Sequence, residues 1–459
     1  MDTLDLILEQ FASYAWGLPL IVLLIGGGVY LTILSRFLPF RYIVHAVRVL
    51  RGKYSNPHDP GEINHFQALM TALSSTVGMG NIAGVAVAIH IGGPGAMFWM
   101  WVSGIVGMTT KFFTCTLAVM YRGRDSEGNV QGGPMYFIME GLGKRWKPLA
   151  IFFSIAGMVG ALPVFNVNQL KQSIDFILLE PNGVAVDTTS SFIIGILLVA
   201  ITSVVIFGGL KRISQTSEKL VPFMVVLYFM AVVFILGVYI DELPKYLVLM
   251  FTDAFEGAFF KGDSFLGGVL GGLILLGVRR GAFSNEAGIG TAPMAHGASR
   301  TGEPVREGLV AMLGPAIDTL VVCTLTALAI LVTGVWQTSD ANGVSLTATA
   351  FRSAMPDYGN YILLICIATF SISSLFTYSY YGTKCMSFLF GAHNKHYYNY
   401  FYIASILMGA MTPLSMMLNL IDGVFALMAI PTMTATLILA PKVVIEAKRY
   451  FKAIGERWS

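Results

Sequence analysis

Charged residues are scarce in this sequence of 459 residues. Asp, Glu, Lys and Arg together make up 12% of it, about half of the roughly 25% that soluble globular domains carry. The formal net charge of +3 is too small to attract a polyanion. These shortages argue against a nucleic-acid binder, a disordered chain and an ordinary cytosolic enzyme. Since 55% of the residues are apolar and the mean hydropathy is +0.70, the composition indicates a polytopic membrane protein in a lipid bilayer.

The sequence also lacks the common catalytic and metal-binding motifs. It contains no His-Glu-x-x-His, no Walker loop and no Gly-x-Ser-x-Gly, which argues against a membrane protease, an ATP-driven pump and a lipase. Its cysteines form no CxxC pair and lie in or at the end of apolar runs, so we expect free thiols packed among helices. They are Cys115, Cys323, Cys366 and Cys385. The sequence therefore predicts a protein that is not an enzyme and has no organic cofactor.

Long apolar runs, in contrast, fill most of the chain. A membrane-spanning helix needs about 20 mostly apolar residues, and the sequence offers eleven such candidates. They are 16–34, 66–91, 95–120, 149–178, 191–208, 221–240, 264–282, 308–334, 359–390, 399–419 and 422–441. The predicted fold class is thus all-α, with about eleven transmembrane helices.

Most of the 29 Lys and Arg residues lie in alternate connections between these runs and in the C-terminal tail. Because cytoplasmic loops carry an excess of Lys and Arg, we expect the N-terminus outside and the C-terminus in the cytoplasm. The predicted divisions are an extra N-terminal transmembrane helix (1–35), a cytoplasmic basic segment (36–65), a first five-helix repeat (66–240), an outer amphipathic segment (241–263), a second five-helix repeat (264–441) and a cytoplasmic basic tail (442–459).

Two of the predicted spans are interrupted by glycine, at Gly78–Gly84 and at Gly267–Gly272. Each glycine costs about 1 kcal/mol relative to alanine inside a helix. One interpretation is close packing of small residues between helices. The other is a local unwinding, which a membrane tolerates only around a cavity or ligand. Each interrupted span begins one of the two predicted repeats, and these have opposite orientations. Paired broken helices in inverted repeats favour a secondary transporter.

Several segments carry a resemblance to the alanine/glycine:cation symporter family. They are Gly78–Val85, Gly92–Trp101, Gly132–Tyr136, Phe283–His296, Asp318–Thr324 and Ser379–Gly382. The resemblance implies one extra N-terminal helix and a ten-helix core of the leucine-transporter type, with 5+5 inverted repeats. It also implies a multi-pass protein of the prokaryotic inner membrane that takes up alanine or glycine together with Na⁺, or sometimes H⁺.

The resemblance further implies which residues bind the substrate. Its carboxylate should meet the first broken helix, where free backbone amides hold an anion and glycine permits a close approach. Facing residues of the fourth and seventh spans should complete the site, although Asn166 and Gln169 could equally form a bond between helices. Val269 stands where the family usually carries a bulky aromatic residue. The predicted substrate-binding residues are Thr76, Gly78, Met79, Gly80, Asn81, Asn166, Gln169, Gly268, Val269 and Leu273.

The resemblance places the sodium ion beside the same break. Ser373 and Ser374 match the adjacent pair of hydroxyls of the family, and the carbonyl groups of Ser74 and Val77 would complete the shell of oxygens. A serine in a membrane helix can instead donate to the carbonyl group four residues earlier. These four residues are the predicted sodium ligands.

Two buried carboxylates have alternative roles. Asp318 is either functional, as intramembrane carboxylates usually are, or a structural partner of Lys111 or Arg280. Glu286 is expected to be an inner-gate or helix-capping residue. For the whole protein, the leading hypothesis is sodium-coupled symport of a small neutral amino acid. The alternatives are the same fold with a larger substrate such as glutamine or with H⁺ coupling, and, in another class, an ion or solute channel.

Overall fold

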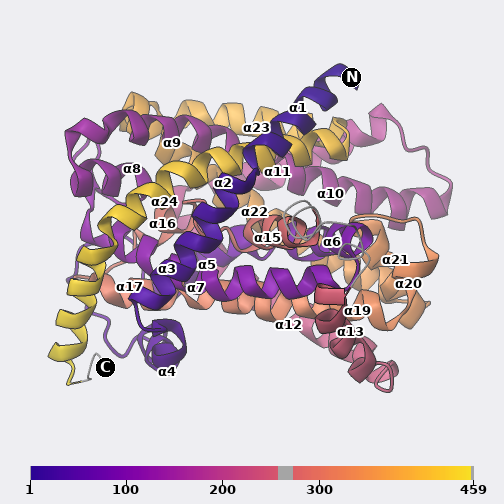
Figure 1. Cartoon of the computed structure of the whole chain (residues 1–459). Helices are drawn as coiled ribbons and strands as arrows, with labels where there is room; N and C mark the ends of the chain where they lie inside the picture. The colour runs from indigo at the N-terminus through magenta and orange to yellow at the C-terminus, as the bar shows by residue number, and fades with distance from the viewer. Residues whose placement is uncertain (1, 257–271, 456–459) are drawn as a thin grey trace.

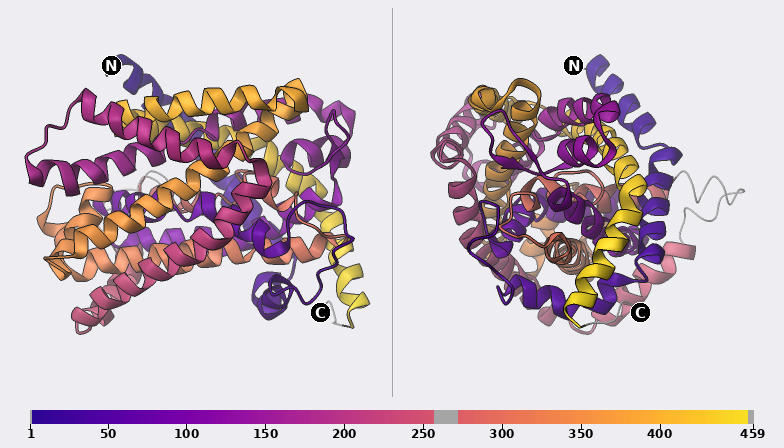
Figure 2. Two further views of the ribbon diagram at one scale, coloured as in Figure 1. Left: turned by 180° about the vertical axis from the view of Figure 1, so that it is seen from behind. Right: turned by 90° about the vertical axis from the view of Figure 1, so that its left-hand side faces the viewer.

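The computed structural model describes residues 2–256 and 272–455. Its helices lie side by side in an elongated bundle (Figure 1), which is roughly cylindrical when seen end-on (Figure 2). In the described part, seven helices are long and apolar enough to cross a membrane, or up to nine if each of two bent pairs counts as one span. The all-α, multi-pass class is confirmed. The count of eleven stays a prediction, because part of span 264–282 lies outside the described residues.

The elements of the first part of the chain are mostly helices, with short 3₁₀ or π turns labelled η. They are α1 (Asp2–Ala15), α2 (Leu18–Ile21), η1 (Val22–Gly26), α3 (Gly27–Leu34), α4 (Leu38–Leu50), α5 (His65–Thr76), η2 (Gly80–Gly84), α6 (Val85–Gly92), α7 (Gly95–Met120), β1 (Gly123–Arg124), β2 (Val130–Gln131), α8 (Pro134–Phe137), η3 (Ile138–Leu142), η4 (Lys144–Trp146), α9 (Lys147–Gly160), α10 (Val164–Ile174), η5 (Asp175–Leu179), η6 (Glu180–Asn182), α11 (Thr188–Ile206), α12 (Gly209–Val238) and α13 (Leu243–Glu256). The two strands form an antiparallel hairpin that pairs Gly123 with Gln131.

The second part is again helical. Its elements are α15 (Leu273–Asn285), α16 (Ala292–His296), α17 (Pro304–Ala311), α18 (Leu313–Pro315), η8 (Ala316–Cys323), α19 (Thr324–Val332), α20 (Val335–Thr338), α21 (Val344–Ala354), α22 (Gly359–Phe390), η9 (Ala392–Asn394), α23 (Lys395–Met411) and α24 (Leu414–Ala453). Of the predicted spans, 95–120 and 359–390 coincide with α7 and α22.

The first glycine-rich span is broken, as the unwinding interpretation requires. A capping box of Asn64 and Gln67 starts α5, and such a box satisfies two of the unpaired backbone amides at a helix N-terminus. The helix ends at Thr76, and Val77 leaves the helical region with ψ of 87°. The axis then bends by 50° before the chain resumes as η2 and α6. Since α5 packs against both α12 and α22, the break lies inside the bundle.

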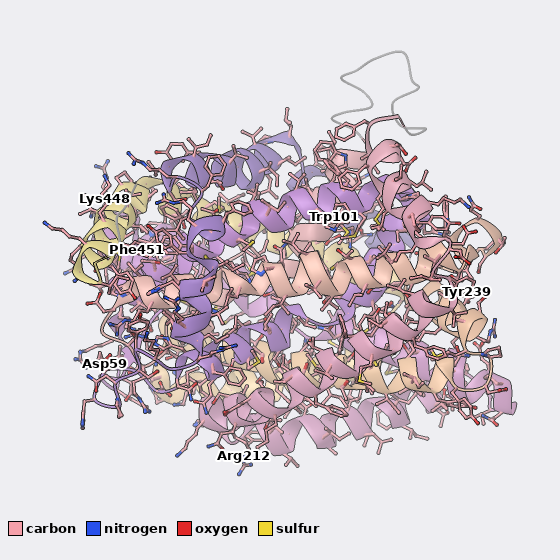
Figure 3. All side chains as sticks on the ribbon, turned by 90° about the horizontal axis from the view of Figure 1, so that it is seen from below. Asp59, Trp101, Arg212, Tyr239, Lys448 and Phe451 are labelled. Atoms are coloured by element: carbon pink, nitrogen blue, oxygen red, sulfur yellow. The ribbon has the colours of Figure 1, made fainter. Side chains whose placement is uncertain are left out.

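The two ends of the bundle differ in the segments they carry. The amphipathic helix α4 and the C-terminus lie at one end, whereas α13, α20 and α21 lie at the other (Figure 1). Lys448 and Asp59 mark the first end and Tyr239 the second (Figure 3). Both α4 and the C-terminal tail belong to the basic segments that the sequence predicts to be cytoplasmic. We therefore call the end of the bundle that carries them the basic end.

Candidate functional site

The break between α5 and α6 opens onto a small cavity inside the bundle. Thr76, Met79 and Gly80 line this central cavity from the broken helix, and Asn166 lines it from α10. The other lining residues come from several helices. They are Ser75, Gly160, Leu162, Phe165, Phe283, Tyr378, Ile421 and Phe425. The structure thus brings four of the predicted substrate-binding residues to one place.

Three phenylalanine rings form an apolar wall of the central cavity. The ring centroids of Phe165 and Phe283 are 5.1 Å apart at an interplanar angle of 90°, the edge-to-face arrangement that aromatic pairs favour. Phe425 continues the row, with its centroid 5.6 Å from that of Phe283. The sequence analysis did not single out these rings, which come from α10, α15 and α24. The only available signal was that Phe283 opens one of the segments that carry the family resemblance.

The predicted sodium ligands meet where α5 ends against α22. The hydroxyl group of Ser74 donates to the carbonyl oxygen of Ser373 over 2.7 Å, and the Ser373 hydroxyl donates to the Ser74 carbonyl over 3.4 Å. A Cβ atom built on Gly78 would lie 2.7 Å from Oγ of Ser374, so this hydroxyl is close to the break. Val77, fully buried, directly precedes Gly78. Ser374 also donates to the carbonyl group of Phe370, four residues earlier, as the alternative predicted, and Ser373 donates to the same carbonyl group three residues earlier.

Asn81 does not line the central cavity, and its side chain contacts η8. Its Oδ1 accepts from the backbone amide of Gly78 over 2.8 Å, and its Nδ2 donates to the Asp318 carboxylate over 2.7 Å. Ser284 and Thr319 also donate to that carboxylate, over 2.9 and 2.7 Å. The side chain of Asn81 is therefore the hydrogen-bond partner of the Gly78 N–H. The buried carboxylate of Asp318, whose other donors are neutral hydroxyl groups, holds Asn81 in place.

The ion pair predicted as one alternative for Asp318 is not formed with either basic residue in the described chain. Arg280 and Arg279 both pair with Asp422 of α24, the latter at 2.6 Å between Nη2 and Oδ2. Asp422 is fully buried and pairs with both guanidinium groups, so its single negative charge is shared between two cations. Lys171 pairs with Asp175 one helical turn away, at 2.5 Å. The structural alternative for Asp318 is therefore wrong for Arg280. Lys111 is buried and interacts electrostatically with Asp318 without a direct ion pair among the described residues, so its structural role stays a prediction.

Among the described residues, Gly78, Asn81, Gln169 and Leu273 of the predicted substrate set lie outside the lining of the central cavity. Gln169 is one turn beyond Asn166 on α10 and donates to Oε1 of Gln172 over 2.8 Å. Leu273 begins α15 and packs against the end of α6. Gly268 and Val269 lie outside the described residues. The substrate roles of all ten predicted residues stay predictions.

Glu286 connects three segments on the side of the central cavity that faces the basic end. Its carboxylate accepts from the hydroxyl groups of Thr291, of Tyr378 over 2.5 Å, and of Ser75 over 3.3 Å. The residue also ends α15 with a left-handed backbone, φ 53°. Glu286 thus terminates a helix and ties the broken α5 to α22 through its side chain.

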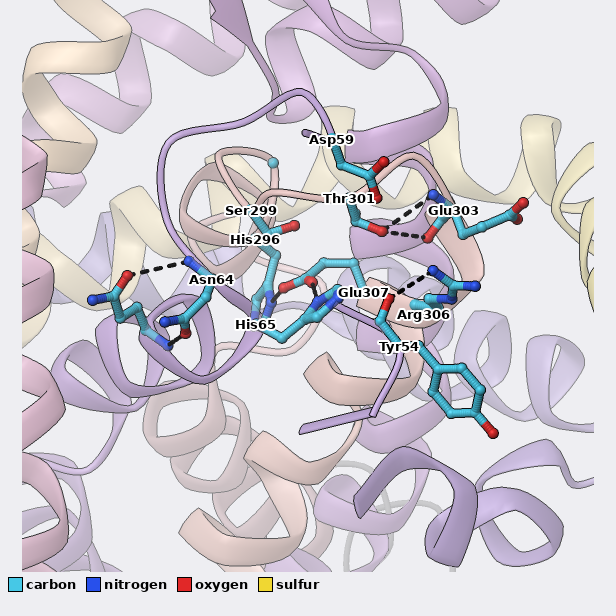
Figure 4. Close-up of polar contacts among 12 residues, drawn as sticks. Tyr54, Asp59, Asn64, His65, His296, Ser299, Thr301, Glu303, Arg306 and Glu307 are labelled. Atoms are coloured by element: carbon cyan, nitrogen blue, oxygen red, sulfur yellow. Dashed lines mark hydrogen bonds and ion pairs between the residues drawn. The ribbon is translucent and has the colours of Figure 1, made fainter. Parts of the chain in front are cut away.

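Another buried carboxylate lies nearer the basic end. Glu307 of α17 contacts Nδ1 of His65, the first residue of α5, and Nδ1 of His296 over 2.6 Å (Figure 4). All three side chains are at most 2% exposed, and Nε2 of each imidazole has no hydrogen-bond partner among the described residues. The sequence analysis missed this cluster because its members are up to 242 residues apart.

The comparison with known families agrees with this geometry. The sodium:alanine symporter family matches residues 1–457. The chain belongs to this family. Because the family and its named relatives are transporters, the prediction of a transporter rather than an enzyme is confirmed. The substrate and the coupling ion stay predictions.

Relatives within the sodium:alanine symporter family carry different names. The sodium/alanine symporter AgcS of Methanococcus maripaludis is 38% identical, over 98% of both chains. The probable sodium/glutamine symporter GlnT of Bacillus subtilis is 35% identical, over 97% of this chain and 91% of its own. A putative sodium/proton-dependent alanine carrier of the same organism, YrbD, is 36% identical over 82% and 76%.

Among solved structures, the chain is similar to MhsT in complex with L-phenylalanine. The TM-score is 0.58, the sequence identity is 13%, and the match covers 84% of this chain and 98% of that one. At this identity the likeness concerns the fold alone. It confirms the predicted core of the leucine-transporter type.

Proposed function

We propose that this protein couples the sodium gradient to the uptake of a small neutral amino acid, alanine or glycine, by alternating access. One observation carries the proposal: the break in α5–α6 adjoins both the central cavity and a cluster of oxygen atoms from Ser74, Ser373 and Ser374. Hydroxyl and carbonyl oxygens are ligands that suit a hard cation. Because the cation and the substrate would share one break, the binding of each would alter the affinity for the other.

The central cavity supports a substrate with a carboxylate and a small side chain. The first backbone amides of a helix have no partner within it, and at η2 these belong to residues that follow Gly78. Since Asn81 already occupies the Gly78 amide, the amides of Met79 and Gly80 are the donors we assign to the carboxylate. The three phenylalanine rings restrict the side chain of the substrate.

The proposal includes an orientation. The basic end would face the cytoplasm, in accordance with the excess of Lys and Arg in cytoplasmic connections, and the N-terminus would lie outside. The two five-helix repeats, 66–240 and 264–441, would rock around the central cavity as in other transporters with inverted repeats. Glu286 and its hydroxyl partners would close the cytoplasmic side of the cavity.

Uptake into proteoliposomes tests the proposal. Radiolabelled alanine should accumulate under an inward Na⁺ gradient, and unlabelled glycine should compete for it. Names of relatives motivate two further arms, glutamine as a competitor and a proton gradient without Na⁺. Stronger competition by glutamine than by alanine would reject the small substrate, and equal uptake with a proton gradient alone would reject Na⁺ coupling. A conductance that does not saturate as the concentration of alanine or of Na⁺ is raised would favour a channel.

A further inference from the structure

A second cavity lies at the basic end of the bundle, separate from the central cavity. It is lined by Glu62 from the connection before α5, by Tyr380 and Lys384 of α22, and by Lys395 and Asn399 of α23. Tyr378, which lines the central cavity, is six residues before Lys384 on the same helix, a rise of about 9 Å. The two cavities therefore follow one another along α22, with the Glu286 cluster beside Tyr378.

Asn399 and Lys384 are among the buried polar side chains that line this second cavity. Asn399 is 6% exposed, and its Oδ1 has no hydrogen-bond partner in the described part of the chain. Leaving such a group unpaired carries a desolvation penalty, which a bound ligand would recover. Lys384 is equally buried, and its ammonium group donates to the carbonyl oxygens of Gly132 and Met294, each over 2.9 Å. An ammonium group has three donors, so one remains for a ligand.

Charges of both signs surround these buried groups. Lys395 and Glu62 both line the cavity, and neither forms an ion pair with another side chain among residues 2–256 and 272–455. Asp125 adds a further carboxylate, which accepts from Asn129 and Gln131 of its own hairpin. A multiply charged phosphate would meet two carboxylates here. A ligand with one cationic and one anionic group would find a partner for each.

We propose that this second cavity binds a free amino acid in its zwitterionic form on the cytoplasmic side of the membrane. Its carboxylate would accept from Lys384 and Lys395, its ammonium group would pair with Glu62, and Asn399 would accept a further hydrogen bond from that ammonium group. This inference rests on the proposed transport function and extends it. The released amino acid occupies a site between the central cavity and the cytoplasm, and so slows further release when its cytoplasmic concentration is high.

The test compares the two faces of the same transporter. Full-length protein is reconstituted in one orientation, and alanine is varied either outside or inside the vesicle. Lys395→Gln removes a charge at a partly exposed position, and Asn399→Leu removes the unpartnered amide. Lys211→Gln is the matched control, because Lys211 is an exposed basic residue near the start of α12 that does not line the cavity.

We expect both cavity variants to raise the half-saturating concentration on the cytoplasmic side at least fivefold. The half-saturating concentration on the outer side should remain that of the wild type. The Lys211→Gln control should change the half-saturating concentration on neither side. Lys395→Gln should not disturb folding because it keeps a flexible polar side chain at a partly exposed position. Outer-side kinetics verify that each variant is folded.

Three results separate the possible failures. The second site is refuted, and the transport function stands, if the wild type transports alanine but Lys395→Gln leaves the half-saturating concentration on the cytoplasmic side unchanged. The same holds if this variant shifts the half-saturating concentrations on both sides equally. If Lys395→Gln alters transport only in vesicles that contain anionic phospholipid, the cavity holds a lipid headgroup and the proposal is overturned. If the wild type shows no sodium-dependent uptake, the proposed function itself fails.

Discussion

Gly78 is the position where one added methyl group should disturb the cation without filling the substrate cavity. A Cβ atom there would lie 2.7 Å from Oγ of Ser374 and 3.6 Å from Oδ1 of Asn166. The first distance is too short for non-bonded contact, so the Ser374 hydroxyl must turn away in a Gly78→Ala variant. Asn166 remains at ordinary van der Waals distance. The change therefore acts first on the proposed sodium ligand.

The size of the effect follows from the loss of one oxygen ligand. Side chains occupy staggered rotamers, so the Ser374 hydroxyl moves by a full rotamer step and leaves the cation. An unmatched buried polar partner costs about 1–3 kcal/mol. At about 1.4 kcal/mol for each factor of ten, the Na⁺ concentration for half-maximal uptake should rise roughly 5- to 150-fold. Uptake at saturating Na⁺ should recover much of its wild-type rate.

The assay is alanine uptake into proteoliposomes as a function of Na⁺ concentration. Gly84→Ala provides the matched control, because Gly84 lies in the same broken helix and a Cβ atom there meets nothing within 4 Å. Alanine is also favoured over glycine in a helix by about 1 kcal/mol, so the control should fold at least as well as the wild type.

The reasoning would be refuted by an unchanged Na⁺ midpoint in Gly78→Ala with normal uptake. It would also fail if the alanine affinity fell at saturating Na⁺ while the Na⁺ midpoint did not move. In that case the methyl group would act on the substrate, and the Gly78 region would belong to the substrate site alone.

Three further predictions concern buried polar groups. The double change Ser373→Ala and Ser374→Ala should raise the Na⁺ midpoint of uptake at least as much as Gly78→Ala, and equal midpoints in mutant and wild type would contradict the ion site. Asp422→Asn should destabilise the protein by about 3–5 kcal/mol, since it leaves the buried Arg280 without its carboxylate; thermal unfolding in detergent measures this. Glu286→Gln should lower the same unfolding midpoint by the equivalent of about 1–3 kcal/mol, because an amide nitrogen cannot accept from the hydroxyl groups that now donate to the carboxylate.

Features that depend on local sequence were predictable. Length and hydropathy placed the spans that became α7 and α22, and the cluster at Gly78–Gly84 indicated the break in the first repeat. In each case the physical cause acts within a few residues: lipid requires a continuous apolar helix, and glycine weakens that helix where it occurs.

Features that depend on how helices pack were not predictable in the same way. Asn166 and Gln169 share a face of α10 by spacing, yet only Asn166 lines the central cavity. Gln169 lies one turn further along α10, where it donates to Gln172 of the same helix. The partner of a buried charge is equally non-local, and a carboxylate near the end of the sequence, Asp422, decided the environment of Arg280.

The pairing of Asp422 has a consequence for Asp318. Because one carboxylate of α24 already binds both Arg279 and Arg280, neither guanidinium group is left to neutralise Asp318. The side chains that donate to Asp318 are neutral, and one of them is Asn81. Asp318 thus orients the side-chain amide of Asn81, whose Oδ1 accepts from the backbone N–H of Gly78 in the broken helix. In the proposed mechanism the cation and the substrate both bind at this broken helix. Asp318, which lies beside the break, would then be a positioning residue for both binding sites.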